Sequence, residues 1–321
     1  GNPWMFEFVD AEIKNGIATI NINRPEAMNA LNETVVAQLG ALLDNLNDDS
    51  TIHTIVLEGA GKAFVAGADV KFFVDRLDEN AFPKIYDFTA DGHDVLSKLE
   101  NSSKTTIALT TGLALGGGLE LALSCDYRIG TRRTQFRFPE TSIGIYPGLG
   151  GTQRTTRICG VNAARWAILA GNWIGPKLAA DLGLLTHLVE PADVDATVGS
   201  IAENGKPSNK YTGAPVRMSE AVQAAVEFYS DENMESIITG QTPEGFNDDD
   251  SYAIRQIKQI SRTAPIALRM ANELIDVASS TNLEEGLAAE LQNLEGIFAT
   301  KDAYEGLSSL IQGRRPTYTN E

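Results

Sequence analysis

The chain begins with apolar segments that alternate with polar turns. Residues 6–13 and 17–23 are rich in β-branched and aromatic residues, and Asn15-Gly16 between them is typical of a hairpin turn. Two paired strands are therefore predicted. Asn32 then precedes residues 33–47, where apolar residues recur at helical spacing, so a helix with Asn32 as its N-cap is expected.

The order of strand, strand and helix repeats as far as residue 138. Short apolar runs predict strands, and longer stretches with helical spacing predict helices. In chain order these are a strand at 54–59, a loop of small residues at 60–69, a helix at about 81–100, a strand at 105–112, a short apolar helix after Gly118, and strands at 126–130 and 135–138. The repeated order predicts an α/β fold of stacked ββα turns.

From about residue 150 the pattern is mostly helical. The expected helices lie at 161–170, 176–182, 217–230, 250–261, 265–279, 283–297 and 301–311. The stretch 203–216 is polar and contains two prolines, so we expect an exposed connection there. These changes divide the chain into a ββα core at 1–195 and a helical C-terminal region at 196–321.

Composition narrows the classes of function. The 43 acidic and 26 basic residues give a formal net charge of −17, so nucleic acid, a polyanion, is not an expected partner. No apolar run approaches the roughly 20 residues that span a membrane, and two cysteines imply no disulfide framework. A cytoplasmic protein without a membrane partner is expected.

Two small-residue segments can bring backbone N–H groups to a ligand. Gly116, Gly117 and Gly118 precede a helix start, where free N–H groups bind a negative oxygen. The loop at 66–69 offers a second donor, the N–H of Ala68, and two convergent donors make an oxyanion hole. The alternative is a tight turn and a small-residue loop without any ligand.

Two glutamates follow these features. Glu120 comes directly after the glycines in an otherwise apolar helix, and Glu140 follows Pro139. Burial raises the pKa of a carboxyl, and two such groups can hold one water molecule and exchange protons with it. The alternative assigns Glu120 to the helix N-terminus as a favourable charge and Glu140 to a loop salt bridge.

The sequence does not contain the residue patterns that metal binding, serine hydrolase chemistry or a phosphate-binding loop would require. His53, His93 and His187 are scattered and have no partners at metal-ligand spacing, so no metal site is expected. The chain has no GxSxG elbow, and residues 144–154 lack the lysine of a phosphate-binding loop.

Several of these segments together resemble the crotonase (enoyl-CoA hydratase/isomerase) superfamily. They cover most of residues 5–190, and the resemblance resumes in the C-terminal helices. The matching segments are NRPEAMNALN at 23–32, GKAFVAGADVKFF at 61–73, GLALGGGLELALSCDYRIG at 112–130, FPETSIGIYPGLGGTQR at 138–154 and AGNWIGPKLAADLGLLTHLV at 170–189. The resemblance implies a crotonase-like spiral of ββα turns with a helical C-terminal region used for trimerisation. It also marks residues near 201–250 as an insertion.

The resemblance implies a role for individual residues. The N–H groups of Ala68 and Gly117 correspond to the family's oxyanion hole, Glu120 and Glu140 to the two glutamates of hydratases, and Gly148 to the position that helps to place the water. For coenzyme A it implies contacts at Ala66, Val70, Lys71, Arg24 and Ala27, with Arg314 or Arg315 as further candidates for its phosphates.

These correspondences imply a hydro-lyase, a short-chain enoyl-CoA hydratase that converts 2-trans-enoyl-CoA to 3-hydroxyacyl-CoA and also serves as a dehydratase. Coenzyme A is part of the substrate, so no cofactor is implied. The expected partners are the acyl-CoA thioester and further copies of the chain, in a trimer or a dimer of trimers. Residues 298–318 also resemble the hydratase half of fusion proteins, which implies a 3-hydroxyacyl-CoA dehydrogenase domain fused upstream. The alternatives are a Δ3-Δ2-enoyl-CoA isomerase, which usually lacks the acid at position 120, and a non-catalytic CoA-ester-binding subunit.

Overall fold

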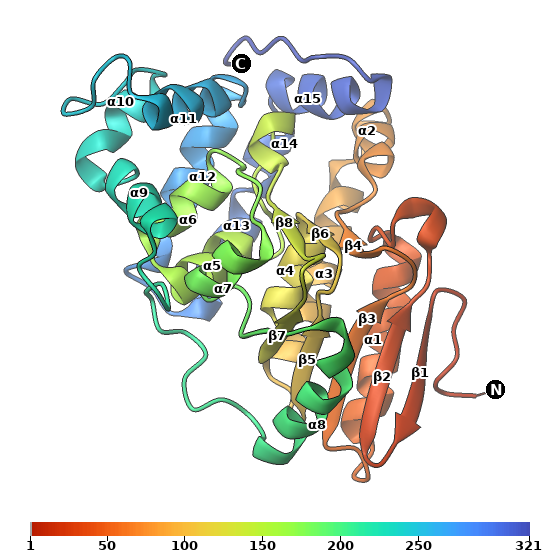
Figure 1. The fold of residues 1–321 in the computed structure, drawn as a ribbon. Helices are drawn as coiled ribbons and strands as arrows, with labels where there is room; N and C mark the ends of the chain where they lie inside the picture. The colour runs from red at the N-terminus through yellow and green to blue at the C-terminus, as the bar shows by residue number, and fades with distance from the viewer. Residues whose placement is uncertain (1) are drawn as a thin grey trace.

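The computed structural model describes residues 2–321, in which two β-sheets are surrounded by helices (Figure 1). A six-stranded sheet has the order β1-β2-β3-β5-β7-β9, and a three-stranded sheet has the order β4-β6-β8. Only the β1–β2 pair is antiparallel within these sheets. The strands are β1 (Val9–Lys14), β2 (Ile17–Ile22), β3 (Thr54–Gly59), β4 (Ala63–Ala66), β5 (Thr105–Leu109), β6 (Leu113–Leu115), β7 (Tyr127–Gly130), β8 (Gln135–Arg137) and β9 (His187–Leu188).

The helices follow the strands in two groups. Those of the first half are α1 (Glu33–Asp48), α2 (Val70–Asp78), α3 (Phe82–Glu100), α4 (Gly117–Leu123), α5 (Gly151–Cys159), α6 (Val161–Ile168) and α7 (Pro176–Leu182). Those of the second half are α8 (Val194–Asn204), α9 (Glu220–Phe228), α10 (Met234–Ile238), α11 (Ser251–Ser261), α12 (Pro265–Ala278), α13 (Leu283–Gln292), α14 (Leu294–Phe298) and α15 (Lys301–Gln312). Short 3₁₀ helices are η1 (Pro25–Ala27), η2 (Glu140–Ile143), η3 (Pro191–Asp193) and η4 (Asp231–Asn233).

After β1 and β2, which both belong to the large sheet, each of the next three pairs of strands contributes one strand to each sheet. β3, β5 and β7 lie side by side in the large sheet, while β4, β6 and β8 lie side by side in the small one. Parallel neighbours require a crossover connection, and helices supply it here. The predicted α/β fold of stacked ββα turns is therefore confirmed, and the cavity described below lies where successive turns meet.

The large sheet is buried on both faces. On one face Ile55, Leu57 and Ala108 belong to the main core together with residues of α1 and α3. On the other face Val56, Ile107 and Ile129 pack against Ile201 of α8. A parallel strand that is covered on both faces is apolar on both faces, which explains the unbroken apolar run at 55–57.

Local predictions at the N-terminus are confirmed. Asn15 and Gly16 adopt positive φ angles of 53° and 77°, as a two-residue hairpin turn requires. The Asn32 side-chain oxygen accepts a hydrogen bond from Val35 N at 2.8 Å and caps α1.

Other segments differ from the prediction. The short strand β4 lies in the stretch expected as a loop, no element was predicted at the position of β6, and helices α5 and α8 were not expected. The single helix predicted at 283–297 is divided at Asn293 into α13 and α14. Residues 205–216 of the predicted connection have no helix, whereas residues 203–204 belong to α8. The connection is not fully exposed, because the Lys210 side chain is only 10% exposed beside Glu100.

Candidate active site

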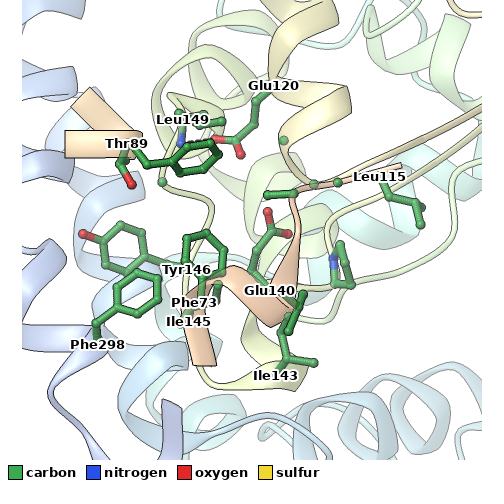
Figure 2. Close-up of a pocket in the computed structure, with 18 of the residues that line it drawn as sticks. Phe73, Thr89, Leu115, Glu120, Glu140, Ile143, Ile145, Tyr146, Leu149 and Phe298 are labelled. Carbon is green, nitrogen blue, oxygen red and sulfur yellow. Dashed lines mark hydrogen bonds between the residues drawn. The ribbon is translucent and has the colours of Figure 1, made fainter. Parts of the chain in front are cut away.

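A cavity of about 240 Å³ lies between the second sheet and the C-terminal helices (Figure 2). Its lining comes from successive ββα turns, from α3 and from α14 and α15, so residues far apart in the chain share one space. The lining residues are Ala66, Gly67, Ala68, Val70, Phe73, Phe88, Thr89, Leu115, Gly116, Gly117, Glu120, Pro139, Glu140, Ile143, Ile145, Tyr146, Gly148, Leu149, Leu294, Phe298 and Leu310.

The three glycines determine how α4 begins beside this cavity. Gly116 has a positive φ of 48°, a conformation that favours glycine. A Cβ on Gly118 would lie 1.9 Å from the carbonyl oxygen of Val65, so only glycine fits against β4 at this position. The close approach of α4 to β4 brings Glu120, in the first turn of the helix, to the cavity.

Glu120 is buried, with 2% of its surface exposed, and has two backbone donors. Its Oε2 accepts hydrogen bonds from Leu149 N at 2.6 Å and from Gly151 N at 2.7 Å. Burial raises the pKa of Glu120 to about 7, while these N–H groups and Arg154 oppose the rise by favouring the charged form.

Glu140 has a different environment in the same cavity. It stands at the start of η2, after Pro139, and its Oε1 has no hydrogen-bond partner among residues 2–321. Burial, followed by the charge of Glu120, raises the pKa of Glu140 well above its usual range. Figure 2 shows the carboxyl groups of Glu120 and Glu140 directed into the same space. The arrangement pairs a group stabilised as a carboxylate with one that retains its proton.

The two predicted backbone donors also line the cavity. The N–H groups of Ala68 and Gly117 have no acceptor among residues 2–321. Gly67 and Gly117 are neighbours, since a Cβ on Gly117 would lie 3.8 Å from the carbonyl carbon of Gly67. Buried N–H groups are almost always paired in proteins, so two unpaired ones beside a cavity are suited to binding an oxygen of a ligand.

Gly148 lines the cavity as well. Its N–H has no acceptor among the residues that the structure describes, and its carbonyl oxygen lies 2.7 Å from His93 Nε2. Gly148 has an ordinary negative φ, and a Cβ there would have its nearest neighbour, Leu294 Cδ1, at 3.5 Å.

The residues predicted to contact coenzyme A divide into two groups. Ala66 and Val70 line the cavity, whereas Arg24, Ala27 and Lys71 lie outside its lining. The two segments that carry them are joined, because Ala66 N donates to Met28 O at 3.0 Å and Leu31 N donates to Gly67 O at 2.9 Å.

The basic candidates already have acidic partners. Lys71 pairs with Asp75 at 2.8 Å in an exposed ion pair, and Arg24 Nη2 lies 3.9 Å from Asp69. Arg314 binds both carboxyl oxygens of Glu305 at 2.8 Å. Exposed pairs of this kind are weak and exchange partners readily.

Sequence reasoning missed a third buried carboxyl beside the first two. Glu290 on α13 is fully buried, and its Oε1 accepts from Gly150 N at 2.7 Å. His93, which sequence analysis treated only as a possible metal ligand, lies 3.7 Å from the same oxygen. The sequence did contain one indication that Glu290 is buried. It lies four residues after Gly286 and four before Leu294, on the helix face of these two buried residues.

Residues 2–321 contain no cluster of three or more histidine, cysteine or acidic side chains arranged to hold a metal ion. Within the same residues no helix is long and apolar enough to cross a membrane.

Comparison with known proteins adds the family. The family model described as enoyl-CoA hydratase/isomerase matches residues 17–321. The chain belongs to the enoyl-CoA hydratase/isomerase family. Within this crotonase superfamily the chain is 37% identical to the short-chain-enoyl-CoA hydratase of Clostridium acetobutylicum, over 95% of this chain and 94% of that protein. It is 32% identical to a probable enoyl-CoA hydratase of Mycobacterium bovis, over 98% of this chain and 99% of that protein.

The family assignment agrees with the fold. The crystal structure of an enoyl-CoA hydratase from Rhodobacter sphaeroides superposes with a TM-score of 0.84 at 23% identity, covering 98% of this chain and 93% of that one. Identity at this level supports the crotonase fold and no finer statement. The expected fold class, including its helical C-terminal region, is therefore confirmed.

Proposed function

We propose that this chain is a short-chain enoyl-CoA hydratase that adds water reversibly across the 2,3 double bond of an enoyl-CoA thioester. The observation that carries the proposal is the unequal pair of buried carboxyls, Glu120 and Glu140, facing one cavity beside two unpaired N–H groups. The relatives named as hydratases, including the crotonyl-CoA hydratase of Syntrophomonas wolfei at 36% identity over 61% of this chain, point to the same activity.

The hydrogen-bond partners support a different role for each carboxyl. Glu120 receives two N–H donors that favour its carboxylate, so it is the base that takes a proton from water. Glu140, whose pKa burial raises well above its usual range, holds the proton that is delivered to carbon. In the hydration direction Glu120 is therefore the general base and Glu140 the general acid.

The proposed hydration proceeds through the following bond changes. Glu120 removes one proton from water, and the hydroxyl oxygen forms a bond to the β-carbon. The electrons of the double bond move toward the thioester carbonyl, whose oxygen gains negative charge and is stabilised by the N–H groups of Ala68 and Gly117. Glu140 donates its proton to the α-carbon, and proton exchange with water restores both carboxyls. Dehydration is the reverse of these steps, and neither direction needs a cofactor, since coenzyme A belongs to the substrate.

The apolar part of the cavity limits the acyl chain. Phe73 contacts Phe88 and Phe298, with ring centroids 6.0 Å and 5.1 Å apart, and these rings close one end. A cavity of about 240 Å³ that must also hold the thioester and a water leaves room for a short acyl group. The size of the cavity supports a short-chain substrate.

Binding of the coenzyme A part is proposed at the joined segments that border the cavity. Ala66 and Val70 would contact the part of the substrate next to the thioester, and Arg24, Ala27 and Lys71 the nucleotide part. The chain carries a net charge of −17, so local basic groups must compensate the repulsion of phosphates. Assembly into a trimer or a dimer of trimers is proposed from the family resemblance, and the mass in solution, measured by light scattering, tests it.

The test is the hydration of crotonyl-CoA, followed by the loss of ultraviolet absorbance of the conjugated thioester. We expect wild-type turnover and a loss of about 100-fold or more in kcat for Glu140→Gln, because general acid catalysis contributes about 10²–10⁴-fold. Equal rates for the two proteins would refute the role of Glu140. Rapid conjugation of a 3-enoyl-CoA without hydration would identify an isomerase, and tight binding without turnover would identify a binding subunit.

A further inference from the structure

We propose that Glu290 is a positioning residue for this reaction: its buried carboxyl holds the 148–152 loop where Leu149 and Gly151 can bind the Glu120 carboxylate. The inference rests on the proposed hydratase function. It adds to the two glutamates a third residue that does not touch substrate.

Three successive N–H groups alternate between two carboxyls. Leu149 N and Gly151 N donate to Glu120 Oε2, at 2.6 and 2.7 Å. Gly150 N, between them, donates to Glu290 Oε1 at 2.7 Å. The other oxygen of Glu290 is hydrogen-bonded to the Thr152 hydroxyl. The two carboxyls therefore hold the same loop, and Glu290 sets the position from which Leu149 and Gly151 reach Glu120.

The 148–152 segment joins a glycine-rich loop to the first turn of α5, and Gly150 O accepts hydrogen bonds from Gln153 N at 3.0 Å and Arg154 N at 2.8 Å. Gly148, Gly150 and Gly151 have no side chains, and glycine backbone is the most flexible in the unfolded chain. Gly150 has a φ of 91°, a conformation that favours glycine. Contacts from other elements therefore add to those of α5 in holding this segment.

Glu290 is at the centre of those contacts. His93 of α3 bonds the carbonyl oxygen of Gly148, and Tyr146 donates from its hydroxyl to the backbone oxygen of Glu290. Gln153 donates to Thr152 Oγ1 at 2.9 Å and to Leu274 O at 2.8 Å. Of these groups only the Glu290 carboxyl bonds a backbone N–H between the two donors to Glu120.

The charge of Glu290 also acts on the catalytic pair. The groups that face it are His93 on α3, Glu120 on α4, Glu140 on η2, Arg154 on α5, and Tyr146. Burial, followed by Glu120, raises the pKa of Glu290 to about 8, and burial lowers the pKa of His93 to about 4. The charge of Glu290 is in turn one cause of the raised pKa of Glu140. Loss of the proton from Glu290 therefore makes Glu140 hold its own proton more tightly.

Two variants separate the hydrogen bonds that Glu290 makes to the loop from the effect of its negative charge. Glu290→Ala removes both, whereas Glu290→Gln keeps an acceptor for Gly150 N and a polar group for Thr152 but cannot ionise. Glu284→Gln, an exposed position on the same helix α13, is the matched control. We measure kcat and KM for crotonyl-CoA, the affinity for butanoyl-CoA by calorimetry, and hydrogen exchange of the 148–151 amides.

For Glu290→Ala we expect a loss of about 100-fold in kcat, the effect of a displacement of about 1 Å in an active site. The Kd of butanoyl-CoA should stay within about threefold, because Glu290 does not line the cavity. For Glu290→Gln we expect a smaller loss in kcat and an alkaline limb of kcat/KM that moves about one pH unit lower, because Glu140 loses a like charge nearby. Substitution of a residue with a purely structural role would not shift the alkaline limb of the kcat/KM profile.

Wild-type kcat and an unchanged pH profile in Glu290→Gln would overturn the proposal. If Glu290→Ala does not fold, as judged by circular dichroism, Glu290→Gln alone carries the test. The failure of the proposed function is distinguishable: a wild-type chain without turnover overturns the hydratase assignment. If the hydrogen exchange of the 149–151 amides is unchanged in a folded Glu290→Ala variant, Glu290 does not hold the loop, whatever the turnover of that variant.

Discussion

At the scale of single residues, identical side chains acquire different chemistry from their partners. Glu120 and Glu140 are both buried in one cavity, yet one has two backbone N–H donors and the other has an oxygen without a partner. A hydrogen bond to a charged form favours that form, while burial alone disfavours it. Two backbone donors oppose the effect of burial on the pKa of Glu120, whereas the charge of Glu120 adds to the effect of burial on the pKa of Glu140, so Glu140 holds its proton more tightly.

This difference predicts a bell-shaped dependence of kcat/KM on pH. The rate should rise as pH passes about 7, where Glu120 loses its proton and becomes a base. It should fall at higher pH, where Glu140 loses the proton that it donates. The measurement is kcat/KM for crotonyl-CoA between pH 5 and 10, and a profile without an acidic limb would contradict the assignment of Glu120 as the base. Glu120→Gln serves as the comparison, with an expected loss of about 100-fold or more.

At the scale of elements, the short helix α14 contributes to the apolar lining of the cavity. It carries Leu294 and Phe298 into the cavity, and Phe298 packs against Phe73 and Phe82. α14 begins directly after Asn293, which follows the end of α13, the helix that carries Glu290. One break in the helix thus separates Leu294 and Phe298, which line the cavity, from Glu290, which binds the backbone of the 148–152 loop.

Phe298→Ala should therefore change chain-length preference. Removing the ring enlarges the apolar end, so the kcat/KM ratio of octenoyl-CoA to crotonyl-CoA should rise by about tenfold or more, since each methylene in an apolar pocket is worth about 10-fold or more. A panel of enoyl-CoA esters of increasing length measures it. Phe246→Ala is the control, because Phe246 packs against Phe228, outside the cavity lining. An unchanged ratio would show that α14 does not limit the chain.

The elements also show how far the sequence predicts the structure. Strands with apolar runs and α1 with its Asn32 cap were predictable, because their burial follows a regular period. α5 was not predictable, since its buried positions include Thr152, Gln153 and Arg154, whose side chains bond partners that are distant in the sequence. Strands β4 and β6 of the second sheet were missed because they have only four and three residues, too few to show a period.

The site was predicted unevenly for a similar reason. The glycines, Glu120 and Glu140 occur in segments where their neighbours are apolar or small, so they stand out locally. Glu290 belongs to an acidic chain with 43 aspartates and glutamates, and α13 carries three other carboxyl or amide side chains that are exposed or half-buried. Only the packing of α13 against the 148–152 loop distinguishes Glu290 from a surface residue.

At the scale of the whole molecule, one carboxylate joins segments from three parts of the chain. Glu100, at the end of α3, binds Arg154 of α5 at 2.8 Å, Lys210 of the 203–216 connection at 3.3 Å and the Tyr211 hydroxyl at 2.5 Å. The Arg154 side chain is only 1% exposed. The charges of Lys210 and Arg154 together hold the pKa of Glu100 below its usual value against the effect of burial.

Glu100→Gln should destabilise the chain markedly. The substitution leaves two buried cations without their counter-charge, and breaking a buried pair in this way costs about 3–5 kcal/mol. Urea unfolding measures the difference, and proteolysis should cut the 203–216 connection sooner. Asp44→Asn, which breaks the exposed pair with Lys98, should cost less than about 1 kcal/mol. A similar, small loss in both variants would mean that Glu100 does not hold the connection.

The order of the chain has a consequence for its synthesis. α13, α14 and α15 supply Glu290, Leu294, Phe298 and Leu310 to a site whose glutamate pair was made more than a hundred residues earlier (Figure 1). A nascent chain that still lacks these helices therefore already contains Glu120, Glu140 and the N–H groups of Ala68 and Gly117. The apolar part of the cavity beside them is not yet covered. We expect this apolar surface to stay uncovered until the last helices emerge, and to stay uncovered in a product terminated before residue 283, which lacks Leu294, Phe298 and Leu310.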